Sequence, residues 1–160
     1  MTADFSTPGL HWSIKRSFVL YVARMADGQI LGSTSVQMTD ASTFLWAPTA
    51  SRQEPAALQI DFGGAVTFGA HGGALSFRVA DPQVELTSGR SRMTVASSGA
   101  VRVPFVDFRA EEAPAEATSG SLRRWFGTDV RLVEEALPMF AGYYGAGESF
   151  DNLTIVLPTD

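Results

Sequence analysis

The sequence contains no cysteine and only two histidines, His11 and His71, among its 160 residues. Without cysteine the chain can form no disulfide, no thiolate metal site and no cysteine nucleophile. Two histidines make a typical zinc site unfavourable and a Ser-His-Asp triad hard to build. These absences argue against several common catalytic and metal-binding arrangements, and they leave the redox compartment open.

The sequence also lacks an excess of positive charge and long hydrophobic runs. Its formal net charge of -5 argues against a nucleic-acid partner, because a phosphate backbone selects for a basic face. No apolar run approaches the roughly 18–20 residues that a membrane-spanning helix needs, so we expect no such helix in this sequence. The opening stretch MTADFSTPGL has neither the charged nor the apolar region of a signal peptide. The expectation for the sequence as given is therefore either a cytoplasmic protein or the mature domain of an exported one.

The composition is that of a folded domain. Hydrophobic residues make up 45% of the chain and charged residues 18%, which is neither a disordered nor a membrane composition. A chain of this length buries roughly 70% of its unfolded surface and needs no covalent staples. We therefore expect residues 1–160 to form a single domain.

Most of the chain alternates apolar and polar residues with a period of two, which is typical of strands with one buried face. Residue pairs typical of turns separate these runs. The apolar positions are Leu58, Ile60 and Phe62; Leu75, Phe77 and Val79; Val84 and Leu86; Met93 and Val95; Val101, Val103 and Phe105; and Leu153, Ile155 and Leu157. Many short strands with frequent turns predict a mainly β fold, an antiparallel β-sandwich with two short α-helices.

Two stretches have helical spacing. The first contains an apolar stripe at i, i+3, i+4, i+7, i+8 and i+11 from residue 14 to residue 25, with Ser17 and Tyr21 one turn apart on its edge. We expect this helix at one end of the sandwich. The second, residues 129–147, repeats Leu132, Ala136 and Phe140 every four residues, and Pro138 should kink or end it. Residues 109–120, rich in Ala, Glu and Pro, are expected to form an exposed loop.

Two side chains have more than one interpretation. Tyr21 is either core filling with a satisfied hydroxyl or a phenol directed at a ligand. His71 lies in the run VTFGAHGGALSF, where Gly69, Gly72 and Gly73 surround it with residues that lack side chains. It is either an exposed histidine in a tight turn or a group beside which a ligand approaches the backbone.

Three separated blocks resemble a known family. They are L-x-W-x-I-K-x-S-F-x-x-Y from Leu10, F-G-G-A-V-x-F-x-x-H-G-G-x-L from Phe62, and F-A-G-Y-Y-x-x-G-x-x-x-D from Phe140. Their order and spacing resemble the HtaA haem-binding domain of actinobacterial haem-uptake proteins. The resemblance extends from Leu10 to about Leu157.

The resemblance implies binding of haem b as Fe(III), with Tyr21 as the axial ligand and His71 assisting it. Ser17 would reach a propionate or the pocket edge. An aromatic side chain of the last block, Phe140 or Tyr143, would stack on or border the porphyrin. The chemistry agrees, because a phenolate is a hard donor suited to ferric iron and a histidine bonded to it would stabilise the anion. The basic residues Lys15, Arg16 and Arg24 would either neutralise propionates or form a solvated helix face.

The resemblance has two departures and leaves alternatives open. The family usually occurs in exported or membrane-anchored proteins, and it commonly has an aspartate after the histidine, where this chain has Gly72. The leading hypothesis is a haem module without turnover, for haem transport and iron acquisition, with haem and another haem carrier as partners; stacked porphyrins would allow a homodimer. One alternative is an enzyme, a haem-dependent peroxidase or a hydrolase using His71. Another is a non-catalytic structural β-sandwich whose aromatic clusters are only core.

Overall fold

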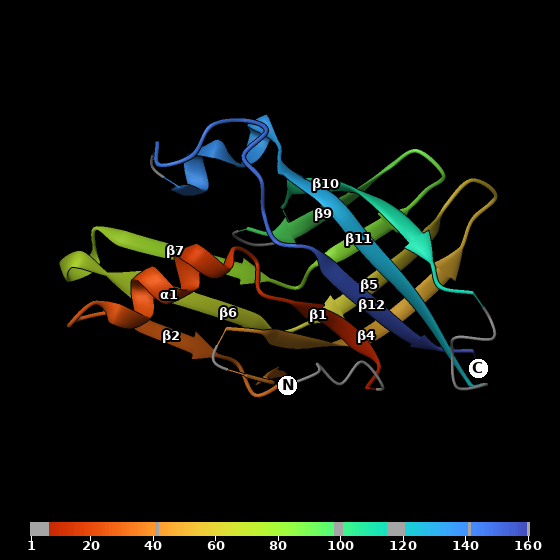
Figure 1. Cartoon of the computed structure of the whole chain (residues 1–160), viewed down its shortest axis with the longest axis horizontal. Helices are drawn as coiled ribbons and strands as arrows, with labels where there is room; N and C mark the ends of the chain where they lie inside the picture. The colour runs from red at the N-terminus through yellow and green to blue at the C-terminus, as the bar shows by residue number, and fades with distance from the viewer. Residues whose placement is uncertain (1–6, 41, 98–100, 115–120, 141, 160) are drawn as a thin grey trace.

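The computed structural model describes residues 7–40, 42–97, 101–114, 121–140 and 142–159, and it is mainly β, as predicted. Figure 1 shows the helical segments gathered toward one end of the molecule. In chain order the elements are β1 (Gly9–Trp12), α1 (Arg16–Arg24), β2 (Gln29–Gly32), β3 (Val36–Met38), β4 (Phe44–Gln53), β5 (Leu58–Gly63), β6 (Ala65–Ala70), the 3-10 helix η1 (His71–Gly73), β7 (Leu75–Ala80), β8 (Gln83–Leu86), β9 (Arg90–Ala96), β10 (Arg102–Glu112), β11 (Leu122–Leu132), the 3-10 helix η3 (Glu134–Phe140) and β12 (Leu153–Pro158).

The larger sheet closes on itself. Its strands pair antiparallel in the order β1-β12-β11-β10-β9-β8-β5-β4, and β4 pairs back onto β1, with Leu10 opposite Trp46. Strand β3 adds to β4, and β2, β6 and β7 form a separate three-stranded sheet. The predicted sandwich is therefore corrected to a closed, barrel-like sheet of eight strands. The alternation of apolar and polar residues indicates that each strand has one buried face, but it does not indicate which strands pair across long sequence distances.

The core lies against the inner face of this sheet. Trp12 and Phe105 meet edge to face at 5.7 Å between ring centroids, and Phe108, Met93 and Ile155 are fully buried in the same core cluster. The predicted alternating runs lie in strands except at Val101, which precedes β10 and is exposed. The pairing of β10 with β9 shifts between residues 104 and 106, so the period of two breaks at this bulge.

Two further predictions need correction. Leu132 is the last residue of β11 rather than the start of a helix, and only Glu134–Phe140 is helical, as a 3-10 helix that contains Pro138. A segment this short and proline-bearing is more easily accommodated as a tight 3-10 turn than as a long α-helix. The predicted exposed loop begins later than expected, because residues 109–112 continue β10. Residues 115–120 lie outside the described part of the chain.

Helix α1 packs on the three-stranded sheet, beside β2 and β6 (Figure 1). Its buried residues are Phe18, Val19 and Val22, and Phe18 contacts Phe68 of β6 and Phe77 of β7 edge to face, at 5.2 and 5.6 Å. Because Val19 is buried as well, the buried face of the helix is rotated away from the predicted stripe. Ser17 and Tyr21 are therefore left on the exposed side of the helix.

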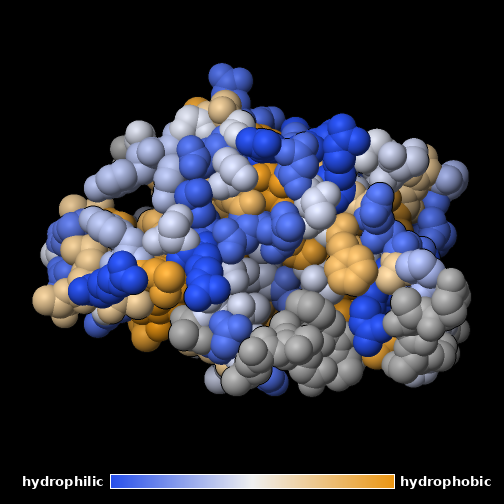
Figure 2. Space-filling view, in the orientation of Figure 1, coloured by the Kyte–Doolittle hydropathy of each residue, from blue (hydrophilic) through white to orange (hydrophobic). Residues whose placement is uncertain are grey.

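No helix in the described residues is long and apolar enough to cross a bilayer. Figure 2 shows a face on which hydrophilic side chains separate small hydrophobic patches. The exposed large hydrophobic side chains include Tyr21 and Tyr143, and these two line one cavity.

Candidate functional site

Tyr21 and His71 form a hydrogen-bonded pair. The Tyr21 Oη atom lies 2.9 Å from His71 Nε2, and the ring centroids are 6.1 Å apart. Tyr21 is 46% exposed, so its interpretation as core filling is wrong. Fifty residues separate the two side chains in sequence. The contact therefore depends on the packing of α1 beside the turn between β6 and β7.

The turn that carries His71 has a left-handed backbone. The φ angles are 55° at His71, 62° at Gly72 and 97° at Gly73, and a hydrogen bond from Ala74 N–H to His71 O closes the turn at 3.1 Å. A Cβ atom at Gly72 or Gly73 would meet nothing within 4 Å. The glycines are thus explained by backbone conformation rather than by lack of space. Of the three residues in this turn, His71 is the one that bears a side chain, and the left-handed conformation costs such a residue about 1–2 kcal/mol.

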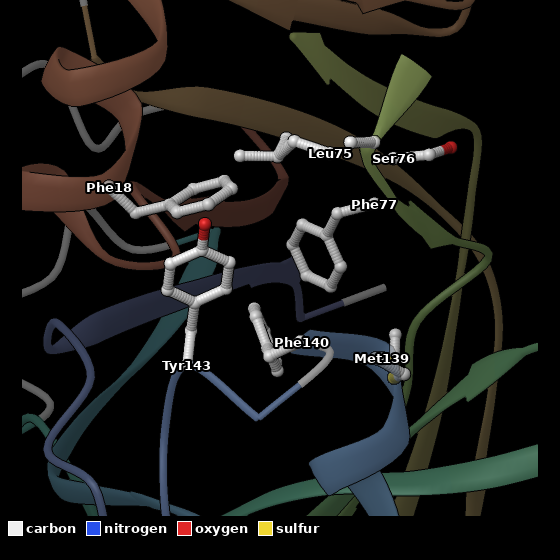
Figure 3. A pocket seen from close by; sticks show the side chains of 8 residues that line it. Phe18, Leu75, Ser76, Phe77, Met139, Phe140 and Tyr143 are labelled. Carbon is white, nitrogen blue, oxygen red and sulfur yellow. The ribbon is translucent and has the colours of Figure 1, made fainter. Parts of the chain in front are cut away.

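A cavity of about 300 Å³ opens beside Tyr21. It is lined by Ser17, Phe18, Tyr21, Leu75, Tyr143 and Tyr144. A smaller crevice of about 40 Å³ adjoins it, shares Phe18, Leu75 and Tyr143, and continues to Phe77, Met139 and Phe140. Figure 3 shows the rings of Phe18, Phe77, Phe140 and Tyr143 around this crevice. The first and last sequence blocks therefore meet at one aromatic cavity.

The structure separates the two late aromatic candidates. Phe140 is only 5% exposed and packs against Phe77 with ring centroids 4.4 Å apart, so it belongs to the core and forms the floor of the crevice. Tyr143 is 68% exposed and lines both the crevice and the larger cavity. Of the two, Tyr143 is the one a ligand in the cavity would meet at the rim.

Lys15 and Tyr144 have roles that the sequence did not reveal. Lys15 Nζ donates to Ser149 O at 2.9 Å, pairs with Glu148 at 3.2 Å and lies 5.5 Å from the centre of the Tyr144 ring. Lys15 is thus used within the fold, contrary to a purely solvated or propionate-binding role. Burial, together with the nearby Glu148 charge, raises the pKa of Tyr144 above its ordinary value, so this phenol is held in its neutral form.

Asp151 fixes the start of α1, and it was missed as a functional position. Its carboxylate accepts a hydrogen bond from Arg16 N–H at 3.2 Å, its backbone carbonyl accepts one from Trp12 Nε1 at 2.8 Å, and its N–H donates to Ile14 O at 2.9 Å. An anionic group at a helix N-terminus is favourable. The sequence did contain a signal for Asp151, because it is the final residue of the last of the three blocks.

The second histidine lies elsewhere. His11 is in β1, is 4% exposed, and has its Nε2 atom 2.8 Å from Thr7 O. It does not line the cavity beside Tyr21. It is therefore badly placed to act on a ligand bound there.

The fold and site together define an antiparallel β domain with an aromatic surface cavity beside a hydrogen-bonded tyrosine–histidine pair. The chain belongs to the HtaA family, a family associated with haem uptake: the family profile, described as Htaa, matches residues 8–156. No curated protein matches the sequence.

Solved structures of HtaA domains from Corynebacterium glutamicum share the fold. The C-terminal domain of that HtaA is 17% identical, with a TM-score of 0.78 over 94% of each chain. The N-terminal domain is 16% identical, with a TM-score of 0.77 over 95% of this chain and 96% of the other. A histidine-to-alanine variant of the C-terminal domain, described as a domain-swapped dimer, is 16% identical, with a TM-score of 0.69 over 98% of this chain and 99% of the other.

Proposed function

We propose that this protein binds ferric haem b through Tyr21 and passes it on in haem transport and iron acquisition, without turnover. The observation that carries the proposal is the 2.9 Å contact between Tyr21 Oη and His71 Nε2 at the edge of the aromatic cavity. A phenolate is an established type of axial ligand for haem iron. Membership of the HtaA family, which is associated with haem uptake, supports haem as the bound molecule.

In this proposal His71 takes up the proton of the Tyr21 phenol. A phenol has to lose its proton before its oxygen can act as an anionic donor to iron. In the tautomer protonated on Nδ1, His71 Nε2 accepts a hydrogen bond from the phenol and can take its proton. The resulting N–H then donates back to the phenolate oxygen and stabilises its charge.

Three features of the cavity support a flat amphipathic ligand: its volume, its apolar wall and its opening to solvent. Its volume of about 300 Å³ is at the lower end of the usual range for ligand pockets, about 300–1,000 Å³, and exposed Tyr21 and Tyr143 leave it open to solvent. Phe18 and Leu75 supply apolar wall, and Ser17 supplies a hydroxyl one helical turn before Tyr21. A macrocycle would thus be partly enclosed, as suits a cargo that has to be handed to another carrier.

Each enzyme alternative needs a second catalytic group, and neither group is found among the described residues around Tyr21 and His71. A haem peroxidase needs a distal base, and His11 is buried in β1 beside Thr7 instead. A hydrolase using His71 needs a nucleophile beside the imidazole, yet its Nε2 atom faces the weakly nucleophilic phenol of Tyr21. The structural alternative leaves unexplained why this phenol–imidazole pair is exposed rather than buried in the core.

The proposal is tested by titrating the purified apo-protein with hemin and recording the absorption spectrum. We expect saturable 1:1 binding and a ferric spectrum of the tyrosinate type. Circular dichroism of the same sample establishes that the apo-protein is folded. Absence of saturable binding by the folded protein would refute the proposal.

Replacing His71 with asparagine is expected to weaken hemin binding by about 10–100-fold, the usual cost of losing a group that supports a metal ligand. Asparagine tolerates the left-handed backbone of His71, so the substitution removes the imidazole with little strain on the turn. Hemin titration measures the effect, and size-exclusion chromatography confirms that the variant keeps the oligomeric state of the wild type. Wild-type affinity in the variant would show that His71 does not assist Tyr21.

A further inference from the structure

The loop after α1 is bonded to the His71 turn through Asp27. A carboxylate oxygen of Asp27 accepts a hydrogen bond from the N–H of Gly72 at 2.7 Å. Backbone hydrogen bonds from Gly72, and secondarily from His71, hold the pKa of Asp27 below its ordinary value, so the carboxylate is charged at neutral pH. Consecutive backbone N–H groups of a turn form a concave anion site, and here a side chain of the same protein fills it.

Asp27 is rigidly connected to Tyr21. The Met25 N–H bonds to Val22 O at 3.1 Å, and the Gly28 N–H bonds to Met25 O at 3.1 Å, which folds the loop tightly against the end of α1. Helix α1 and this loop therefore contact the His71 turn at two points, the Tyr21 phenol on the imidazole and the Asp27 carboxylate on the Gly72 N–H. The second attachment, on the backbone of the turn, limits how far the turn can move relative to α1 and so limits where the imidazole can lie.

The sequence gives no carboxylate next to His71, since Gly72 and Gly73 follow it. The turn is exposed, and its left-handed residues at 71, 72 and 73 make no other backbone hydrogen bond to α1 among those the structure describes. Asp27 is therefore the group that attaches the backbone of the turn to the tyrosine-bearing segment.

We propose that Asp27 is a positioning residue that holds the His71 turn so that the Nε2 atom faces the Tyr21 phenol. The inference deepens the proposed haem function and rests on it for its effect on haem. Without the carboxylate, His71 would spend less time bonded to Tyr21, and haem held by that phenolate would dissociate faster.

The test compares Asp27→Ala and Asp27→Asn with a matched control, Asp81→Asn. Asp81 accepts a hydrogen bond from the Gly64 N–H at 2.9 Å, so it makes the same kind of contact, where β6 begins and β7 ends, away from the His71 turn. Two readouts are needed. NMR of the apo-protein follows the exchange of the Gly72 amide proton and the ring resonances of His71, and transfer of haem to an excess of an apo-haem protein gives the dissociation rate of the loaded protein.

In Asp27→Ala we expect faster exchange at Gly72, shifted His71 ring resonances and haem dissociation about tenfold faster, at the lower end of the effect of removing a supporting group. Asp27→Asn should be intermediate, because a neutral amide oxygen is a weaker acceptor than a carboxylate. Asp81→Asn should match the wild type in both readouts. Unchanged His71 resonances in Asp27→Ala would overturn the positioning role, and so would equal changes in the control.

The two proposals fail in distinguishable ways. If the wild type takes up no hemin while Asp27→Ala still shifts the His71 ring resonances, the haem function is refuted and the positioning role stands. If the wild type binds hemin and Asp27→Ala matches it in both readouts, the haem function stands and the positioning role is refuted.

Discussion

Tyr21→Phe is expected to abolish the ferric tyrosinate absorption of the hemin complex and to weaken hemin binding by more than about 100-fold, beyond the range for a merely supporting group. The substitution removes one oxygen atom, the proposed iron donor, and keeps the ring that lines the cavity. Tyr21 is 46% exposed, so stability should change by only about 0.5 kcal/mol, as at other surface positions. Hemin titration and thermal unfolding measure the two effects separately.

The same substitution at a neighbouring tyrosine provides the control. Tyr144 lines the same cavity, but its ring lies under Lys15 and its pKa is raised. Tyr144→Phe should therefore keep the tyrosinate absorption. A hemin complex of Tyr21→Phe with the wild-type spectrum would contradict the assignment of Tyr21 as ligand.

Phe140→Ala should destabilise the protein by about 3–5 kcal/mol, the usual cost of truncating a buried phenylalanine. Phe140 is 5% exposed and contacts Phe18, Phe77, Phe105, Tyr144 and Phe150. For a domain of this size the loss corresponds to a fall in melting temperature of roughly 6–20 °C, at about 2–4 °C per kcal/mol. Thermal unfolding followed by circular dichroism measures it.

Tyr143→Ala is the paired comparison, because it truncates the other aromatic candidate at a position that is 68% exposed. The melting temperature of this variant should stay close to that of the wild type. Its hemin affinity should fall, because the cavity loses the Tyr143 ring from its edge. The reverse pattern, a stable Phe140→Ala and an unstable Tyr143→Ala, would contradict the division into core floor and cavity rim.

Local sequence pattern identified six of the twelve strands in the described residues, namely β5, β7, β8, β9, β10 and β12, for a physical reason. In a strand, successive side chains point to opposite faces, so the alternation at Leu58, Ile60 and Phe62 appears directly as the buried face of β5. Helical periodicity likewise placed Phe18 and Val22 in the core. It misplaced Tyr21, because the edges of an apolar stripe are set by the surface on which the helix packs.

The alternation of apolar and polar residues does not determine which strands pair with each other. The sandwich and the closed sheet require the same alternating strands, and they differ in whether β1 also pairs with β4. Leu132, Ala136 and Phe140 are all buried with the spacing of a helix, yet a strand end and a 3-10 helix achieve that burial. Spacing records which side chains are buried and leaves open which backbone buries them.

By itself the sequence determined the mainly β class, the position of the first helix, and a group of residues in three blocks that points to the HtaA family. Only the tertiary structure decided that Tyr21 Oη lies 2.9 Å from His71 Nε2, that Phe140 is core while Tyr143 borders the cavity, that Lys15 is paired with Glu148, and that Asp27 bonds to Gly72. The physical reason is the sequence distance over which each kind of information acts. Side-chain periodicity is a property of neighbouring residues, whereas each of these contacts depends on how segments distant in sequence pack once the sheet has closed.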